Sequence, residues 1–65
     1  MQIRVNGKEL EVAAATLASL LDELEYQDQV VATALNHAFV RAVDRRETVL
    51  KPGDAVEILT PKQGG

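Results

Sequence analysis

The chain has 65 residues, of which 46 % are hydrophobic, and its formal net charge is −3. Nine of the 30 hydrophobic residues are alanine, so only 21 larger apolar side chains are available to build a core. A ligand cleft of about 300–1,000 Å³ would take up most of the interior that so short a chain can bury. We therefore predict one small domain that is not itself an enzyme.

Composition excludes further classes of protein. The sequence has no cysteine and a single histidine, His37, which argues against a disulfide framework, a thiolate metal site or a histidine cluster. Ten acidic residues outnumber seven basic ones, whereas small nucleic-acid binders usually have a basic surplus. No apolar run is long enough to span a membrane, and the first residues do not resemble a signal peptide. We expect a cytoplasmic protein with no bound cofactor or metal and with neither nucleic acid nor membrane as partner.

The first twelve residues predict a β-hairpin. Apolar and polar residues alternate over 1–5 and again over 9–12, which is typical of half-buried strands. Between them lies Asn6-Gly7, the dipeptide that two-residue hairpin turns favour because both positions accept positive φ.

An amphipathic helix should follow. Leu17, Leu20, Leu21 and Leu24 form a single apolar stripe, and Thr16 is placed to cap the helix. Ser19 stands where a capping box usually has Glu, so we expect only half of that box. The helix should end near Tyr26, where no glycine provides a stop signal. The residues expected to face solvent are Ser19, Asp22, Glu23 and Glu25.

The second half of the chain predicts further strands. Residues 30–35 form a β-rich run, Asn36-His37 is the tip of a second hairpin, and the return strand is expected to include Phe39, Val40 and Val43. His37 is more consistent with a turn residue than with a general base or a metal ligand, because no acid or thiol neighbours it in sequence.

The segment that follows this hairpin is charged and then apolar. Residues 44–47 predict a charged turn with 3₁₀ character, and residues 48–50 form a short apolar segment. Lys51-Pro52-Gly53-Asp54 has the composition of a tight turn. A last strand is predicted over 55–60, and Pro61 ends it because proline has no backbone donor.

The order of elements indicates a sheet with one covered face. A single leucine stripe can cover one face of a four- or five-stranded sheet. Leu59 should point away from Val56 and Ile58, because neighbouring strand residues alternate between faces. It is either part of a contact surface or an ordinary exposed leucine.

The sequence ends in Gly64-Gly65, directly after the predicted last strand and Pro61. One interpretation is a reactive tether: a terminal carboxylate becomes open to attack once it is adenylated, and glycine, which lacks Cβ, can pass through a narrow slot. Residues 61–65 would extend about 16–18 Å, enough to enter a partner's site. The alternative is a frayed end without function.

The whole chain resembles the sulfur carrier proteins of thiamine biosynthesis (the ThiS type), which belong to the ubiquitin-like β-grasp family. The segments that carry the resemblance are residues 1–7, 17–24, 31–36, 49–59 and 64–65. It implies an α+β fold of the β-grasp type, with a mixed four- to five-stranded sheet and one main helix packed on one face. The folded domain would comprise residues 1–60, and residues 61–65 would form a flexible tail.

The resemblance also implies a function and partners. An E1-like adenylyltransferase (ThiF type) would use ATP and Mg²⁺ to adenylate Gly65, and a sulfur donor protein would convert it to a thiocarboxylate that supplies sulfur to thiazole synthase (ThiG type). Gly64, Gln63 and Lys62 would enter the partner's site with it.

The candidate docking residues are Leu59, Arg41 and Phe39. Such carriers often have Val-Pro-Arg after the second hairpin, and this chain departs from that pattern with Val40-Arg41-Ala42.

Several alternatives stay open at this point. The small subunit of molybdopterin synthase shares the fold and the ending. A ubiquitin-like modifier and a β-grasp interaction module without carrier chemistry are also compatible with the sequence. The basic residues of the second half could steer a partner or only be solvated; they are Arg41, Arg45, Arg46 and Lys51.

Overall fold

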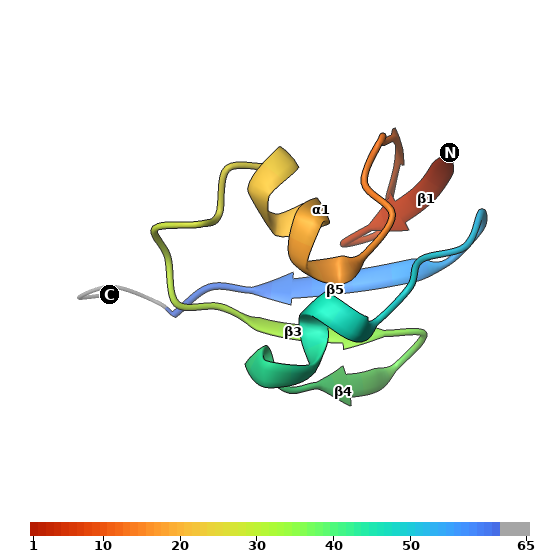
Figure 1. Ribbon diagram of the computed structural model, residues 1–65. Coiled ribbons are helices and arrows are strands. Elements are labelled where there is room, and N and C mark those ends of the chain that lie inside the picture. Colours follow the sequence, from red (N-terminus) through yellow and green to blue (C-terminus); the bar gives the residue numbers. More distant parts are fainter. Residues whose placement is uncertain (62–65) are drawn as a thin grey trace.

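The computed structural model describes residues 1–61 and shows a single mixed sheet with helices on one side (Figure 1). Its strand order is β2-β1-β5-β3-β4. The central pair, β1 and β5, is parallel, and the remaining neighbours are antiparallel. The strands are β1 (Gln2–Val5), β2 (Lys8–Glu11), β3 (Ala32–Leu35), β4 (Ala38–Val40) and β5 (Ala55–Leu59). This arrangement confirms the predicted α+β fold of the β-grasp type, with five strands.

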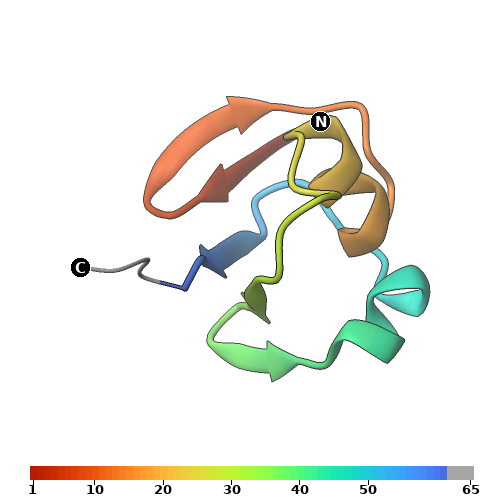
Figure 2. The ribbon, with the colours of Figure 1, turned by 90° about the vertical axis from the view of Figure 1, so that its left-hand side faces the viewer.

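Two helices, α1 (Leu17–Glu23) and the 3₁₀ helix η1 (Ala42–Glu47), pack against each other. Figure 2 shows both on the same side of the strands. The predicted leucine stripe faces the sheet: Leu17 and Leu20 are fully buried, and Leu24 is partly buried against them. The sheet contributes every second residue to this core, including Ile3, Val5, Val56 and Ile58.

The N-terminus of α1 differs from the expectation of half a capping box. The Ser19 amide donates to the Thr16 hydroxyl at 3.2 Å, and the Thr16 amide donates to the Ser19 hydroxyl at 3.1 Å. Both halves of the box are therefore present. The expectation was wrong because a serine at this position is long enough to reach the backbone of the cap residue.

The C-terminus of α1 ends without glycine. The helix stops at Glu23, slightly before the predicted end at Tyr26, and Glu25 adopts a φ of 67°. The Tyr26 amide donates to the Leu21 carbonyl at 2.8 Å, and the Glu25 amide donates to the Asp22 carbonyl at 3.0 Å. These two bonds form a Schellman motif, in which Glu25 occupies the left-handed position that glycine usually fills.

Both predicted hairpin turns are confirmed. Asn6 and Gly7 have φ values of 51° and 82°, and Asn36 and His37 have φ values of 50° and 73°. Positive φ at both central residues fits the twist of the flanking strands. His37 is therefore an exposed turn residue.

The prediction that Val43 belongs to the return strand was wrong. Strand β4 ends at Val40, and Val43 lies on η1 with 74 % of its surface exposed. The Asp44 amide donates to the Arg41 carbonyl at 2.9 Å, and the Asp44 carboxylate accepts from Arg41 Nε at 3.0 Å. These contacts turn the chain into η1 directly after β4, so the expected 3₁₀ turn is longer and starts earlier than the charged segment.

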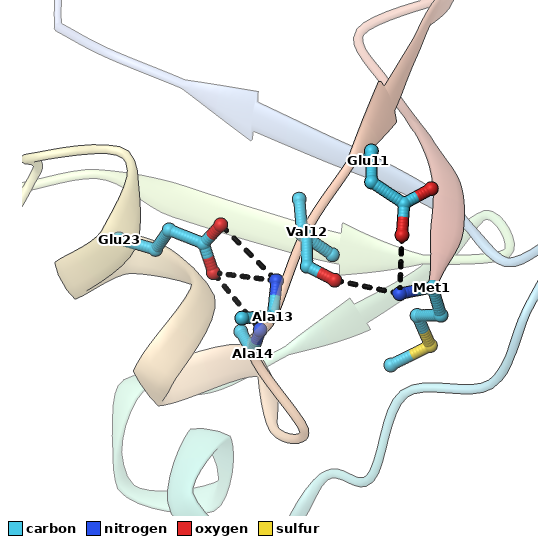
Figure 3. A network of polar contacts seen from close by, with 6 residues as sticks. All are labelled: Met1, Glu11, Val12, Ala13, Ala14 and Glu23. Atoms are coloured by element: carbon cyan, nitrogen blue, oxygen red, sulfur yellow. Dashed lines mark hydrogen bonds and ion pairs between the residues drawn. The ribbon is translucent and has the colours of Figure 1, made fainter.

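The Glu23 carboxylate and the Met1 ammonium group fix the segment between β2 and α1 (Figure 3). Glu23 was expected only to face solvent, but its carboxylate accepts from the amides of Ala13 and Ala14 at 2.9–3.2 Å. The Met1 ammonium group lies 3.0 Å from the Glu11 carboxylate and donates to the Val12 carbonyl at 2.7 Å. The helix thus ties down the connector that leads into it.

Candidate functional site

The face of the sheet opposite the helices has a polar half and an apolar half. On β1 and β2 it carries polar residues: Arg4 lies 3.6 Å from the Glu9 carboxylate, and Gln2 donates to that carboxylate at 3.2 Å. On β3, β4 and the end of β5 it carries mainly apolar residues. The strand register determines this division, because residues paired across strands share a face.

Four residues of this half form what we call the apolar patch: Ala32, Ala34, Phe39 and Leu59. The exposed Glu57 of β5 is paired with Ala34 and borders the patch. Ala34 is paired with Phe39, and Ala32 is paired with Leu59. Phe39 and Leu59 are 70 % and 68 % exposed, although both are large apolar side chains. Val56 and Ile58, the neighbours of Leu59 on β5, are buried. The predicted outward orientation of Leu59 is therefore confirmed.

An open hollow of about 340 Å³ extends from the apolar patch to the root of the tail. Leu59, Thr60 and Pro61 line one part of it, and the segment 30–32 lines the other. Val30 was predicted to start a strand, but β3 begins only at Ala32, and Val30 is 84 % exposed. The C-terminal end of β5 thus leaves the sheet beside exposed apolar side chains.

Two of the three candidate docking residues, Leu59 and Phe39, lie on the same face. Arg41 follows β4 and is 69 % exposed, but its guanidinium group is paired with Asp44. The predicted carrier residue Gly65 and the predicted tail residues Gly64, Gln63 and Lys62 lie outside the described residues. Their roles stay predictions.

The sequence analysis missed how firmly β5 is held at its ends. Asn6 Oδ1 accepts from the Ile58 amide at 2.9 Å, and Asn6 Nδ2 donates to the Ile58 carbonyl at 3.2 Å. At the other end, Asn36 Oδ1 accepts from the Ala55 amide at 2.9 Å. Both asparagines were recognised only as turn residues, and their second role depends on β5, which is distant in the sequence.

A second missed residue is Arg45, which was grouped with the basic residues that could steer a partner or only be solvated. Its Nε donates to the Thr33 hydroxyl at 3.0 Å, and its Nη2 donates to the Val31 carbonyl at 2.6 Å. These bonds join η1 to the beginning of β3. Arg45 therefore has a structural contact, whereas no hydrogen bond or ion pair of the Arg46 side chain occurs within residues 1–61.

No group of three or more His, Asp or Glu side chains within residues 1–61 is arranged to hold a metal ion. Over the same residues, no helix combines the length and apolar character needed to cross a bilayer.

The chain forms a five-stranded mixed sheet with one main helix across it, and its last strand, β5, lies at the centre of the sheet. This arrangement defines a protein of the ubiquitin-like β-grasp class. The model of the ThiS family matches residues 3–65, and the chain belongs to this family.

Two solved structures are similar to the chain over its whole length. One is the crystal structure of a thiamine biosynthesis protein (ThiS) from Geobacter metallireducens, which is 35 % identical, has a TM-score of 0.82 and is covered completely. The other is an NMR structure of a thiamine biosynthesis protein from the same organism, with 35 % identity, a TM-score of 0.80 and 88 % of its chain covered. No curated protein matches the chain. Family and neighbours together support a sulfur carrier in thiamine biosynthesis.

Proposed function

We propose that the chain carries sulfur as a thiocarboxylate on Gly65 and donates it for formation of the thiazole ring of thiamine. The observation that supports this best is the family match, which extends through residue 65 and so includes the Gly64-Gly65 ending. The fold adds a second argument: β5 lies at the centre of the sheet and ends at Leu59, and Thr60 and Pro61, which follow it, lie beside exposed apolar side chains.

The chemistry requires two steps at the carboxyl group. A Gly65 carboxylate oxygen attacks the α-phosphorus of ATP, and pyrophosphate leaves, which gives an acyl-adenylate. Hydrosulfide delivered by the sulfur donor then attacks the acyl carbon, and AMP leaves with the oxygen that linked it to the acyl group, which gives the thiocarboxylate with no change of oxidation state. Because a carboxylate is a poor electrophile and an acyl-phosphate anhydride is a good one, adenylation must precede sulfur transfer.

The catalytic groups belong to partners under this proposal. An E1-like adenylyltransferase (ThiF type) binds the ATP and Mg²⁺, a sulfur donor protein supplies the sulfur, and thiazole synthase (ThiG type) consumes it. The apolar patch provides the docking surface, with Leu59 next to the tail and Phe39 two strands away. Dependence on ATP places the carrier in the cytoplasm.

Intact-mass spectrometry tests the proposal. We expect incubation with the adenylating partner, MgATP and a sulfur donor to raise the mass by the difference between one sulfur and one oxygen. The matched control is the chain that ends at Gly64, which should keep its mass and its melting temperature. An unchanged mass of the 65-residue chain under conditions in which the partner hydrolyses ATP would contradict the proposal.

A further inference from the structure

Strand β5 extends beyond the strand that supports it on one side. β1 ends at Val5, and the chain turns away at Asn6-Gly7. The last main-chain hydrogen bond on this side runs from the Asn6 amide to the Val56 carbonyl at 2.9 Å. Ile58, two residues further along, directs its amide and carbonyl to the same side. Within residues 1–61, no strand lies there to pair with them.

The side chain of Asn6 takes the place of the missing strand. Its amide group presents one acceptor and one donor, and the Ile58 amide and carbonyl use both, at 2.9 and 3.2 Å. On the other side of β5, Leu59 is paired with Ala32 of β3. The last two residues of β5 are therefore held from both sides, immediately before the tail begins.

We propose that Asn6 is a positioning residue for sulfur transfer, which fixes the end of β5 so that the tail leaves the domain in one direction. The inference rests on the proposed carrier function. A segment that enters a narrow site must lose conformational freedom, and a root that is already ordered lowers this cost. Asn6 acts through Ile58 and needs no contact with the reacting atoms.

Asn36 provides a matched comparison within the same molecule. It occupies the corresponding position of the second hairpin turn, and its φ of 50° is close to the 51° of Asn6. Its side chain also makes two hydrogen bonds, from the Ala55 amide at 2.9 Å and to the Asp54 carboxylate at 3.1 Å. These bonds hold the beginning of β5, at the opposite end from the tail.

The experiment compares Asn6→Gly with Asn36→Gly in the full-length chain. Glycine keeps the positive φ of both turns and removes only the side-chain bonds. Formation of the thiocarboxylate is followed by intact mass with the adenylating partner, MgATP and a sulfur donor, well below the melting temperatures of both variants. Under the proposed function the apolar patch docks first and determines KM, and the tail enters the site in a later step that contributes to kcat. For Asn6→Gly we therefore expect kcat to fall about fivefold at unchanged KM, the size expected from the loss of one or two hydrogen bonds. Asn36→Gly should match the wild type in both constants.

Amide hydrogen exchange gives an independent structural measurement. Asn6→Gly should remove protection at Ile58 and weaken it at Leu59, whereas Asn36→Gly should remove it at Ala55. Equal kcat in both variants, or unchanged protection at Ile58 and Leu59, would overturn the positioning role. An increase in KM for Asn6→Gly would also overturn it, because it would indicate direct contact with the partner. If the wild-type chain is not converted at all, the carrier function itself is rejected and the positioning role with it.

Discussion

Thr33 links three elements through one buried hydroxyl group. It is 2 % exposed and is the one buried polar side chain within residues 1–61. Its hydroxyl donates to the Val40 carbonyl at 2.9 Å and accepts from Arg45 Nε at 3.0 Å. Strand β3, the end of β4 and helix η1 thus meet at this oxygen. A buried polar group stabilises the fold only while its hydrogen bonds are formed.

Replacement of Thr33 by Val tests this contact, because valine keeps the shape and removes the hydroxyl. The Val40 carbonyl and Arg45 Nε would each lose a partner, so we expect the free energy of unfolding to fall by about 1–3 kcal/mol. Urea denaturation followed by circular dichroism measures it. Thr60→Val makes the same change at an exposed position and should alter stability by less than about 0.5 kcal/mol. Equal stability of the two variants would contradict a role for the hydroxyl.

Glu25 occupies a backbone conformation that glycine adopts more easily. The left-handed conformation costs an ordinary residue about 1–2 kcal/mol, and glycine avoids this cost but loses part of the gain to the entropy of the unfolded chain. Glu25→Gly should therefore stabilise the domain by about 0.5–1 kcal/mol. Asp28→Gly is the control, because Asp28 does not have positive φ. It removes an equal charge and should destabilise. Thermal unfolding of both variants measures these changes in stability, and a lower melting temperature for Glu25→Gly would disprove the prediction.

At the scale of elements, α1 also stabilises the connector that precedes it. The Glu23 carboxylate accepts three hydrogen bonds from two amides of the connector that precedes the helix. We expect Glu23→Ala to lower stability by about 1 kcal/mol, which corresponds to about 4–8 °C in the melting temperature of so small a domain. Asp22→Ala removes the same charge from the same helix, and no hydrogen bond or ion pair of the Asp22 side chain occurs within residues 1–61. Equal melting temperatures of the Glu23→Ala and Asp22→Ala variants would contradict the prediction.

The elements that local patterns specify could be predicted from the sequence. Both hairpin turns and the leucine stripe depend on residues only a few positions apart. The errors have a common physical origin in contacts that periodicity does not describe. Val43 continues an apolar pattern, but the bonds between Arg41 and Asp44 start a helix there. Glu25 takes a glycine's conformation because the packing of Tyr26 and Leu24 against the core holds the chain in place.

At the scale of the whole molecule, the apolar patch could be predicted only in part. The alternation along β5 predicts an outward Leu59, but its alignment with Ala32 depends on the register between β3 and β5. Asn6 and Asn36 show the same limit, because each meets β5 only in the assembled sheet. The tail residues that were assigned the chemistry lie outside the described residues, and the structure describes the surface at Leu59, Thr60 and Pro61 from which the chain continues toward them.

The patch should contribute to binding and not to folding. Phe39 is 70 % exposed, so Phe39→Ser should change the free energy of unfolding by less than about 0.5 kcal/mol. Loss of a central aromatic contact typically costs more than about 1 kcal/mol in binding, so we expect the Kd for the adenylating partner to rise about tenfold. Calorimetric titration measures it. Val43→Ser, a similarly exposed change on the helical side of the sheet, should leave the affinity unchanged. Equal weakening by both variants would place the interface elsewhere.

The size of the domain leads to a prediction about its two enzymatic partners. Its accessible surface is 4518 Å², and a standard interface covers about 800 Å² of each protein, or about a fifth of this one. Both partners need the same glycine carboxylate, and the surface next to its root is the apolar patch. We therefore expect them to compete: thiazole synthase should raise the apparent KM of the adenylating enzyme for the carrier without changing kcat. Leu59→Asp in the carrier should weaken both complexes together. Native mass spectrometry that detects one carrier bound to both enzymes, with unimpaired adenylation, would refute a shared surface and would require a second docking site on the polar half of the sheet or on the helices.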